Sequence, residues 1–176
     1  DFFDAVFFFG AGPGSLSEQQ MADLLAFVRD DGKGFVAAHT GDNAFQQHPG
    51  YRDMVGGLWD HPWTKSEKLE VELPIIVEDP AFPAMQGLPS TFTVYDEAAV
   101  HKAPYSRENV RVLASVDLGK LDPALGRSPD TDKDVPIAWA REYGAGRVFY
   151  SVLGHSDQSW DNPQVQQMFL NALRWA

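Results

Sequence analysis

Three strand-like segments end in residues whose types could perform acid–base chemistry, and a histidine marks two of them. His39 closes the apolar run 34–38 and is followed by Asp42, whereas His155 stands two residues before Asp157. An imidazole has an unperturbed pKa near ~6.5, so it can exchange protons or bind a metal at neutral pH. We expect His39 and His155 to be catalytic, with Asp157 orienting His155. The alternatives are a core histidine bonded to the backbone for His39 and a turn capped by Asp157.

The third segment, 91–95, runs into the adjacent acids Asp96 and Glu97. A carboxylate at a strand end can abstract a proton next to a ketone or accept hydrogen bonds from sugar hydroxyls. We therefore expect Glu97 to be catalytic, and Asp96 and Asp42 to bind substrate. Adjacent acids also occur in solvated turns, which is the alternative.

An aromatic segment, 58–63, contains Trp59, His61 and Trp63. Indole rings can stack on the apolar face of a pyranose, so we predict a loop that contributes these three residues to substrate binding. The alternative is that the rings only pack the loop on the core. The remaining histidines, His48 and His101, are expected at the surface.

Histidine nitrogens also make a metal site conceivable, with His39, His61 and His155 as ligands for zinc or manganese. The sequence has no tight ligand spacing such as two histidines on successive turns of one helix. It has no cysteine either, which excludes thiol chemistry and disulfides. A divalent metal is therefore an open alternative to acid–base catalysis by side chains alone.

The composition predicts one globular domain over residues 1–176, with 44% hydrophobic residues and a formal net charge of -11. A strongly acidic chain repels nucleic acid, so no such partner is expected. No apolar stretch reaches the roughly 20 residues that span a bilayer, and the first residues do not follow a signal-peptide pattern. These features fit cytoplasm and periplasm equally, and they fit a homo-oligomer or a larger multidomain protein.

Hydrophobic periodicity predicts a strand, a helix and a second strand at the start of the chain. A strand ends near Phe9, Ser17 and Gln20 form a capping-box pattern before a helix that stops at Gly32, and 34–38 is the next strand. Such crossovers are right-handed and join parallel strands. We therefore predict an α/β fold with a mainly parallel sheet.

The later elements are less regular until the last third of the chain. There, 136–143 and 146–152 flank a turn as a C-terminal β-hairpin, and Asn162 with Pro163 begins a terminal amphipathic helix. The other predicted elements are strands over 68–73, 91–95 and 110–116, a short helix over 51–55 and a surface loop over 118–134.

Short motifs recur in a fixed order along the chain. They are Gly32 to His39, Gly56-Gly57 with His61-Pro62-Trp63, Gly87-Leu88-Pro89, Val94 to Glu97, Pro136 to Trp139, Gly146 to Tyr150, Leu153 to His155, and Asn171 to Trp175. Together they resemble the ThuA-like, trehalose-utilisation family over nearly the whole chain. The family's first strand and helix are expected to be missing upstream of Asp1.

This resemblance implies a flavodoxin-like, three-layer fold similar to class I glutamine amidotransferases. In those enzymes the strand-to-helix elbow holds a nucleophilic cysteine, and His39 takes that place here. His155 and Asp157 match the spacing of the histidine and acid that follow a late strand in those enzymes. The resemblance therefore implies a related cleft without glutamine amidotransferase activity.

The same resemblance implies a role in sugar catabolism, on a trehalose-type disaccharide or its 3-keto form. We expect a hydrolase, lyase or isomerase that acts on a small carbohydrate by acid–base or metal-assisted chemistry. The alternative is a non-catalytic carbohydrate-binding or accessory domain that keeps the cleft without its chemistry, since a fold alone does not supply a function.

Overall fold

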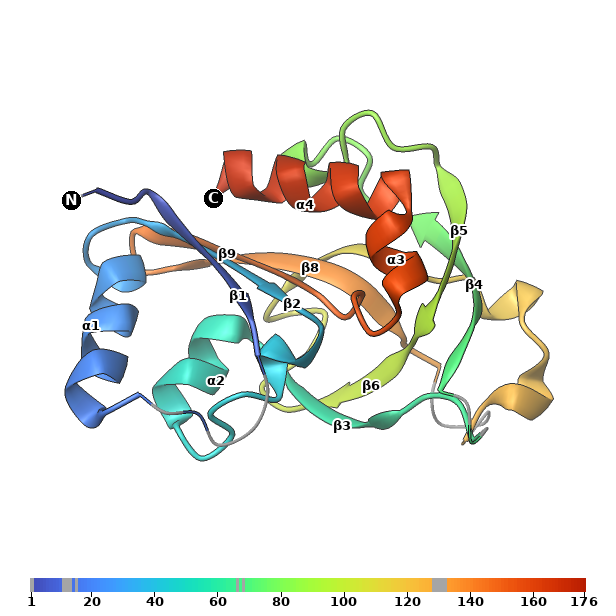
Figure 1. Ribbon diagram of the computed structural model, residues 1–176, viewed down its shortest axis with the longest axis horizontal. Coiled ribbons are helices and arrows are strands. Elements are labelled where there is room, and N and C mark those ends of the chain that lie inside the picture. The colour runs from blue at the N-terminus through green and yellow to red at the C-terminus, as the bar shows by residue number, and fades with distance from the viewer. Residues whose placement is uncertain (1, 11–13, 15, 66, 68, 128–132) are drawn as a thin grey trace.

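The computed structural model describes residues 2–10, 14, 16–65, 67, 69–127 and 133–176. Within these ranges a seven-stranded sheet has the order β1-β2-β9-β8-β7-β4-β5, and a separate two-stranded ribbon joins β3 to β6 (Figure 1). The strands of the sheet are β1 (Ala5–Phe9), β2 (Gly34–Ala38), β4 (Glu70–Val77), β5 (Thr91–Glu97), β7 (Arg111–Val116), β8 (Pro136–Tyr143) and β9 (Gly146–Ser151). Those of the ribbon are β3 (Leu58–Pro62) and β6 (Ala99–Lys102).

Four α-helices and four short 3-10 helices are described. The α-helices are α1 (Glu18–Arg29), α2 (Pro49–Val55), α3 (Asp157–Asp161) and α4 (Pro163–Trp175). The 3-10 helices are η1 (His39–Asp42), η2 (Pro83–Met85), η3 (Leu118–Lys120) and η4 (Pro123–Leu125). The last two lie in the predicted surface loop, of which residues 128–132 are outside the described ranges. Lys68, the first residue of a predicted strand, is also outside them, and β4 begins at Glu70.

The predicted strand, helix and strand at the start of the chain are confirmed. Strands β1 and β2 are parallel, and α1 between them has the full capping box: Oγ of Ser17 accepts from the amide of Gln20, and the Gln20 side chain accepts from the amide of Ser17. Strand β9 continues the parallel pairing on the other side of β2. Because β2 lies between two parallel neighbours, it is buried along its whole length and its end opens toward a loop.

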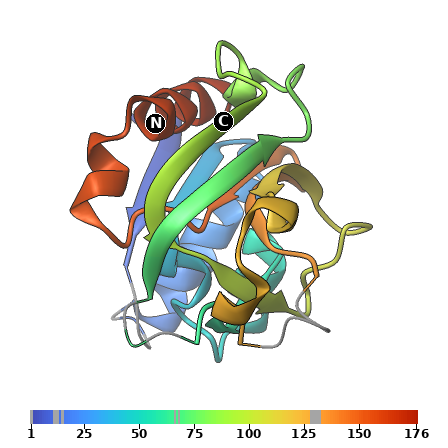
Figure 2. The same ribbon diagram turned by 90° about the vertical axis from the view of Figure 1, so that its right-hand side faces the viewer.

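The prediction of a mainly parallel sheet is wrong. Strands β8, β7, β4 and β5 each pair antiparallel with their neighbours, as the green strands β4 and β5 show side by side in Figure 2. Parallel pairing needs a long crossover, usually a helix. From β4 to β9 the described chain has only 3-10 helices, so short connections return each strand beside its neighbour in the opposite direction. The sheet is mixed and curled, and flavodoxin-like layering is not confirmed.

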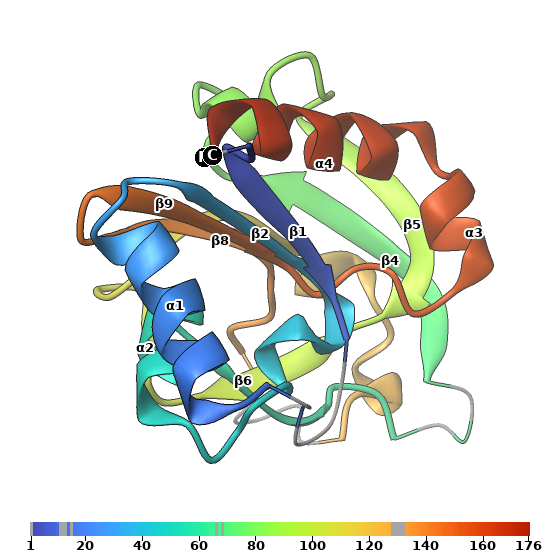
Figure 3. The same cartoon turned by 60° about the vertical axis from the view of Figure 1, so that its left-hand side comes forward.

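Helices cover both faces of the parallel strands. Helix α4 lies on one side of β1 and β2, and α1 and α2 lie on the other (Figures 1 and 3). The predicted C-terminal elements are confirmed, since β8 and β9 form a hairpin and Asn162 caps α4 with Pro163 as its first residue. No described helix is long and apolar enough to cross a membrane.

The predicted aromatic loop is instead the strand β3. It pairs antiparallel with β6, so that Trp59 stands opposite His101. The pairing shifts register between Trp59 and His61, and the buried residues of the ribbon are Leu58, Ala99 and His101. Strand β3 packs against η1, which directly follows β2, so the ribbon lies beside the point where that strand ends.

Candidate functional site

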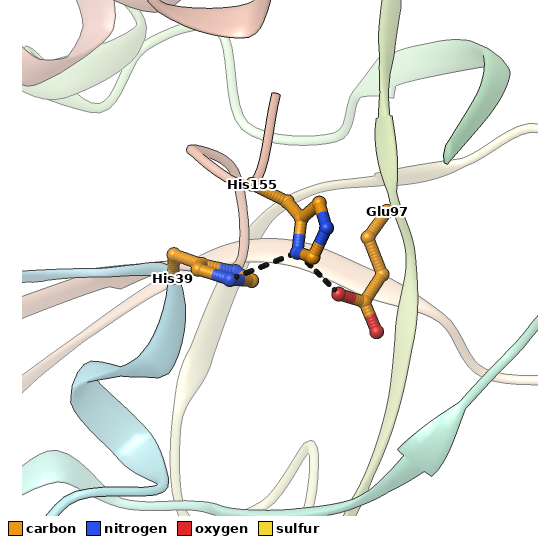
Figure 4. A group of neighbouring side chains, drawn as sticks. All are labelled: His39, Glu97 and His155. Atoms are coloured by element: carbon orange, nitrogen blue, oxygen red, sulfur yellow. Dashed lines mark hydrogen bonds and ion pairs between the residues drawn. The ribbon is translucent and has the colours of Figure 1, made fainter. Parts of the chain in front are cut away.

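Three side chains from distant segments converge beside the ribbon: His39, Glu97 and His155 (Figure 4). His39 follows β2 as the first residue of η1, Glu97 ends β5, and His155 lies between β9 and α3. Nδ1 of His155 is 3.2 Å from Nε2 of His39 and 3.0 Å from Oε2 of Glu97. The sequence predicted all three as catalytic residues, and the structure brings them together.

His39 has a strained backbone at the strand-to-helix elbow. Its φ is 48°, a left-handed value that is uncommon for residues other than glycine. The hydroxyl of the buried Tyr150 donates to the carbonyl oxygen of His39 at 2.8 Å, which helps to hold this conformation. Non-glycine residues in such conformations cluster at functional sites, because the surrounding structure must stabilise the strain.

The hydrogen bonds of His39 fix the position of its proton. Nδ1 lies 3.2 Å from the carbonyl oxygen of Val152, which can only accept, so Nδ1 donates. In the neutral ring Nε2 is therefore an unprotonated nitrogen that faces His155 and Glu97. On the far side of the second imidazole, Nε2 of His155 is 3.4 Å from Oε1 of Glu70. Each ring thus directs one nitrogen to the cluster and the other to an acceptor behind it.

Asp96 holds the segment that carries His155. Its buried carboxylate accepts from the amides of Gly154 at 2.7 Å, His155 at 3.0 Å and Ser156 at 3.1 Å, and from that of Glu97 at 2.9 Å. Sequence analysis expected Asp96 to bind substrate. The contacts give it a positioning role instead, because backbone amides take up both of its oxygens.

Burial shifts the pKa values of two members of the cluster. Removal from water lowers the pKa of His39, and the nearby His155 acts in the same direction. Burial also raises the pKa of Glu97, with further increases from Asp96 and Glu70, against a lowering by His155. His39 is therefore a neutral imidazole near pH 7, and the Glu97 carboxylate is in a site that favours a compensating positive charge.

A cavity of about 200 Å³ opens beside the cluster. Its walls include His39, Glu97 and His155 together with Asp42, Trp59 and Tyr150. The predicted substrate-binding residues Asp42 and Trp59 thus lie at the cavity. A larger hollow of about 430 Å³ lies elsewhere, between the start of α1 and residues 43–48.

Three other predicted residues lie away from this cavity. Trp63 is 2% exposed and packs in the core, so its ring has no face free for a sugar. His61 is half-buried on β3, with Nδ1 3.0 Å from Oδ2 of Asp60. It was expected as a metal ligand together with His39 and His155, but the third member of that group is Glu97. Asp157 is the exposed first residue of α3, and the carboxylates in contact with His155 belong to Glu97 and Glu70.

Sequence analysis missed His101, which was expected at the surface. The His101 side chain is fully buried, and Nε2 is 3.2 Å from Oδ2 of the equally buried Asp42. The apolar run 98–100 before it indicated a buried strand, and alternation from Ala99 would have placed His101 on the inner side. His48, also expected at the surface, is half-buried and caps α2 by accepting from the amide of Tyr51.

The three converging atoms have the geometry of a metal-ligand set. They lie within 4.8 Å of one another, and the two contacts of 3.0 and 3.2 Å are near the ligand separation of about 3.3 Å around a tetrahedral zinc. Metal-binding histidines usually bond their second nitrogen to a carbonyl or carboxylate, as His39 does with Val152 and His155 with Glu70. The residues present fit a divalent ion held by two nitrogens and one carboxylate.

Comparisons with known proteins agree with this architecture. A model of the ThuA family, described as trehalose utilisation, matches residues 1–176. A ThuA-like protein from Parabacteroides merdae ATCC 43184 is 20% identical with a TM-score of 0.79, over 99% of this chain and 70% of that one. A ThuA-like protein from Bacteroides uniformis ATCC 8492 is 21% identical with a TM-score of 0.74, over 98% and 69%.

The fold also matches part of a larger enzyme. A β-galactosidase from Bacillus circulans sp. alkalophilus has a TM-score of 0.56 at 16% identity, over 98% of this chain and 21% of that one. No curated protein matches the chain. At these identities the solved structures establish the fold, and the chemistry has to be argued from the residues of the cavity.

Proposed function

Because this chain belongs to the ThuA, or trehalose utilisation, family, we propose that it is an enzyme of sugar catabolism that converts a sugar or 3-keto-sugar at the cavity beside β2. His39, Glu97 and His155 bind a divalent metal ion, zinc or manganese, in this proposal. The proposal includes no glutamine amidotransferase activity, because the chain has no cysteine and the strand-to-helix elbow after β2 carries His39.

The observation that supports this proposal is the convergence of Nε2 of His39, Nδ1 of His155 and a Glu97 oxygen on one point. Two nitrogens and one carboxylate oxygen suit zinc, and a site with three protein ligands leaves a position for substrate or water. The ion would also offset the unfavourable burial of the Glu97 carboxylate.

The residues would divide the work as follows. A bound ion would polarise a substrate carbonyl or lower the pKa of a bound water. Asp96 and Tyr150 hold His155 and His39 in place through backbone hydrogen bonds. Trp59, half-buried at the cavity wall, would supply the aromatic ring on which a pyranose stacks. Proton abstraction next to a keto group would lead to elimination or isomerisation, and attack by activated water to hydrolysis.

The same three residues could act without a metal. Nε2 of His39 would then be the general base, and Glu97 would stabilise a protonated His155. This version predicts activity that resists chelation, whereas the metal-assisted version predicts activity that chelation abolishes and zinc or manganese restores.

The test is conversion of trehalose and its 3-keto derivative, followed by proton NMR, with wild type and the variants His39→Ala, Glu97→Gln and His155→Ala. His48→Asn is the matched control, because it removes an imidazole outside the cavity while asparagine can still cap α2. We expect wild type and His48→Asn to convert the keto-sugar, and each cluster variant to lose at least about 100-fold in rate, a size typical of lost acid–base catalysis.

Two outcomes would contradict the proposal. Wild type that binds sugar tightly but converts neither compound, with or without added metal, would indicate a non-catalytic carbohydrate-binding domain. Cluster variants that keep the wild-type rate would place the chemistry outside this cavity.

A further inference from the structure

We infer that Asp42, with His101 fixed behind it, forms a hydroxyl-binding floor in the cavity, and that the cavity accepts a neutral, unphosphorylated polyol such as a single pyranose ring with free hydroxyls. This inference rests on the proposed function, since it names the substrate class of the same cavity. It assigns Asp42 to substrate binding and makes His101 the positioning residue behind it.

The buried carboxylate of Asp42 lacks well-directed hydrogen-bond donors. Its side chain is 1% exposed and lines the cavity, and neither oxygen has a properly directed hydrogen bond within the described part of the chain. Its neighbours are Nε2 of His101, 3.2 Å from Oδ2, and the hydroxyl of Tyr150, which also donates to the carbonyl oxygen of His39. A buried carboxylate without a well-directed donor is costly, so a ligand that brings hydroxyl donors gains what these neighbours supply only in part.

Aromatic residues hold His101 in place. Its ring stands edge-on to Trp139, with centroids 4.9 Å apart at 88°, and also contacts Tyr150 and Tyr105. Trp139 is itself held by its hydrogen bond to the carbonyl oxygen of Val55. The imidazole therefore cannot turn away from Asp42, whose Oδ2 lies 3.2 Å from Nε2. A fixed partner on one side leaves the other side of the carboxylate for the cavity.

The cavity has no excess positive charge. The residues that line it include the acids Asp42 and Glu97 and the imidazoles of His39 and His155, but no lysine or arginine among those described. The two carboxylates would balance a divalent ion held by the cluster, so no net positive charge would draw in a phosphate or carboxylate on the substrate. Neutral hydroxyls donate to carboxylates and need no such charge.

The cavity is small. The cavity volume of about 200 Å³ is below the range of about 300–1,000 Å³ typical of pockets for drug-sized ligands. It suits one sugar ring rather than a whole disaccharide. The half-buried Trp59 can cover the apolar face of that ring while Asp42 binds its hydroxyls from the floor.

The experiment measures binding by isothermal titration calorimetry with trehalose, its 3-keto derivative and trehalose 6-phosphate. The proteins are wild type, Asp42→Asn, His101→Leu and His101→Gln, each checked for melting temperature and metal content. We expect wild type to bind one or both neutral sugars and to reject the phosphate. Asp42→Asn and His101→Leu should bind the neutral sugar about 10- to 100-fold more weakly, because the first removes the charged acceptor and the second removes the ring that lies 3.2 Å from it.

His101→Gln separates positioning from mere packing. Its amide N–H can take the place of Nε2–H beside Asp42, so it should recover most of the affinity lost in His101→Leu, whereas a purely structural role would make both variants equally weak. The inference is overturned if Asp42→Asn binds as wild type does, if trehalose 6-phosphate binds as tightly as the neutral sugars, or if wild type binds neither neutral sugar.

The metal measurement keeps this inference distinct from the proposed function. Sugar binding that depends on Asp42 in a protein with no metal and no turnover would refute the proposed chemistry and still support the hydroxyl-binding floor. A metal-dependent enzyme whose sugar affinity is unchanged in Asp42→Asn would support the proposed chemistry and refute the hydroxyl-binding floor.

Discussion

The backbone amide of His155 donates to Oδ1 of Asp96 at 3.0 Å, and this contact fixes where the imidazole lies. Successive side chains of a strand point to opposite faces, so Asp96 faces the backbone of the His155 segment while Glu97 faces the imidazole ring. Two adjacent acids thus have different tasks at the end of β5. One holds the loop, and the other contacts its functional side chain.

Asp96→Asn should therefore damage both stability and the site. An amide would turn an N–H₂ group toward backbone donors, and we expect a loss of about 2–4 kcal/mol in the free energy of unfolding. The control is Asp161→Asn at the exposed end of α3, which should change stability by less than about 0.5 kcal/mol. Urea unfolding of the two variants checks this. Equal stability of Asp96→Asn and wild type would contradict the positioning role.

Glu97→Gln should stabilise the metal-free protein at neutral pH. The pKa of Glu97 is raised in the folded state above its ordinary value of 4.5, so its contribution to stability is fully present below that value and is lost as pH rises through the folded pKa. Glutamine has no such loss. We expect the variant to melt higher than wild type at pH 7, on the order of 2–4 °C for about 1 kcal/mol, and to lose this advantage near pH 4.

Calorimetry of chelator-treated proteins across this pH range is the measurement. The lowered pKa of His39 acts with the opposite sign, because its contribution is present above the ordinary value of 6.5 and is lost as pH falls through the folded pKa. This contribution of His39 is common to wild type and Glu97→Gln, so the difference between their melting temperatures isolates the contribution of Glu97. The control is Glu72→Gln, the same substitution at an exposed position of β4 outside the cluster. A melting temperature of Glu97→Gln below that of wild type at pH 7 would contradict the predicted cost of burying the Glu97 carboxylate.

Tyr150→Phe should weaken the site by releasing the strained His39. Its hydroxyl donates to the carbonyl oxygen of His39, while the equally buried Tyr51 donates to that of Gly41 at 2.7 Å. Loss of either hydrogen bond should cost about 1 kcal/mol of stability. Only Tyr150→Phe should also lower metal affinity, by about 10-fold, as changes behind metal ligands do. Competition with a zinc indicator dye measures the metal affinity of Tyr150→Phe and of Tyr51→Phe. Equal affinities would refute the role of the Tyr150 hydroxyl in positioning His39.

The elements that sequence analysis predicted correctly are those set by local patterns. The Ser17 capping box, the β8–β9 hairpin and the Asn162 cap with Pro163 each depend on residues a few positions apart. The direction of the middle strands depends on pairings between distant segments, such as β4 with β7, which single-strand patterns do not encode. For that reason the mainly parallel sheet was predicted wrongly.

The site follows the same division. His39, Glu97 and His155 were found because polar residues at strand ends stand out from apolar runs. Their mutual contact, and the replacement of His61 by Glu97 in the ligand set, required the fold. His101 was missed because, although the apolar run before it indicated a buried strand, its neighbours in the sequence give no sign of its distant partner Asp42.

Metal content of the purified protein is the measurement that tests the central claim most directly. Wild type and His48→Asn, prepared without chelators and supplied with zinc or manganese, should each hold close to one equivalent of metal per chain by mass spectrometry. His39→Ala and His155→Ala should each hold far less, because each removes a ligand nitrogen, and so should Glu97→Gln, because it replaces the charged carboxylate by a neutral amide. Wild type that retains no metal under these conditions, or cluster variants that retain as much as wild type, would contradict the account.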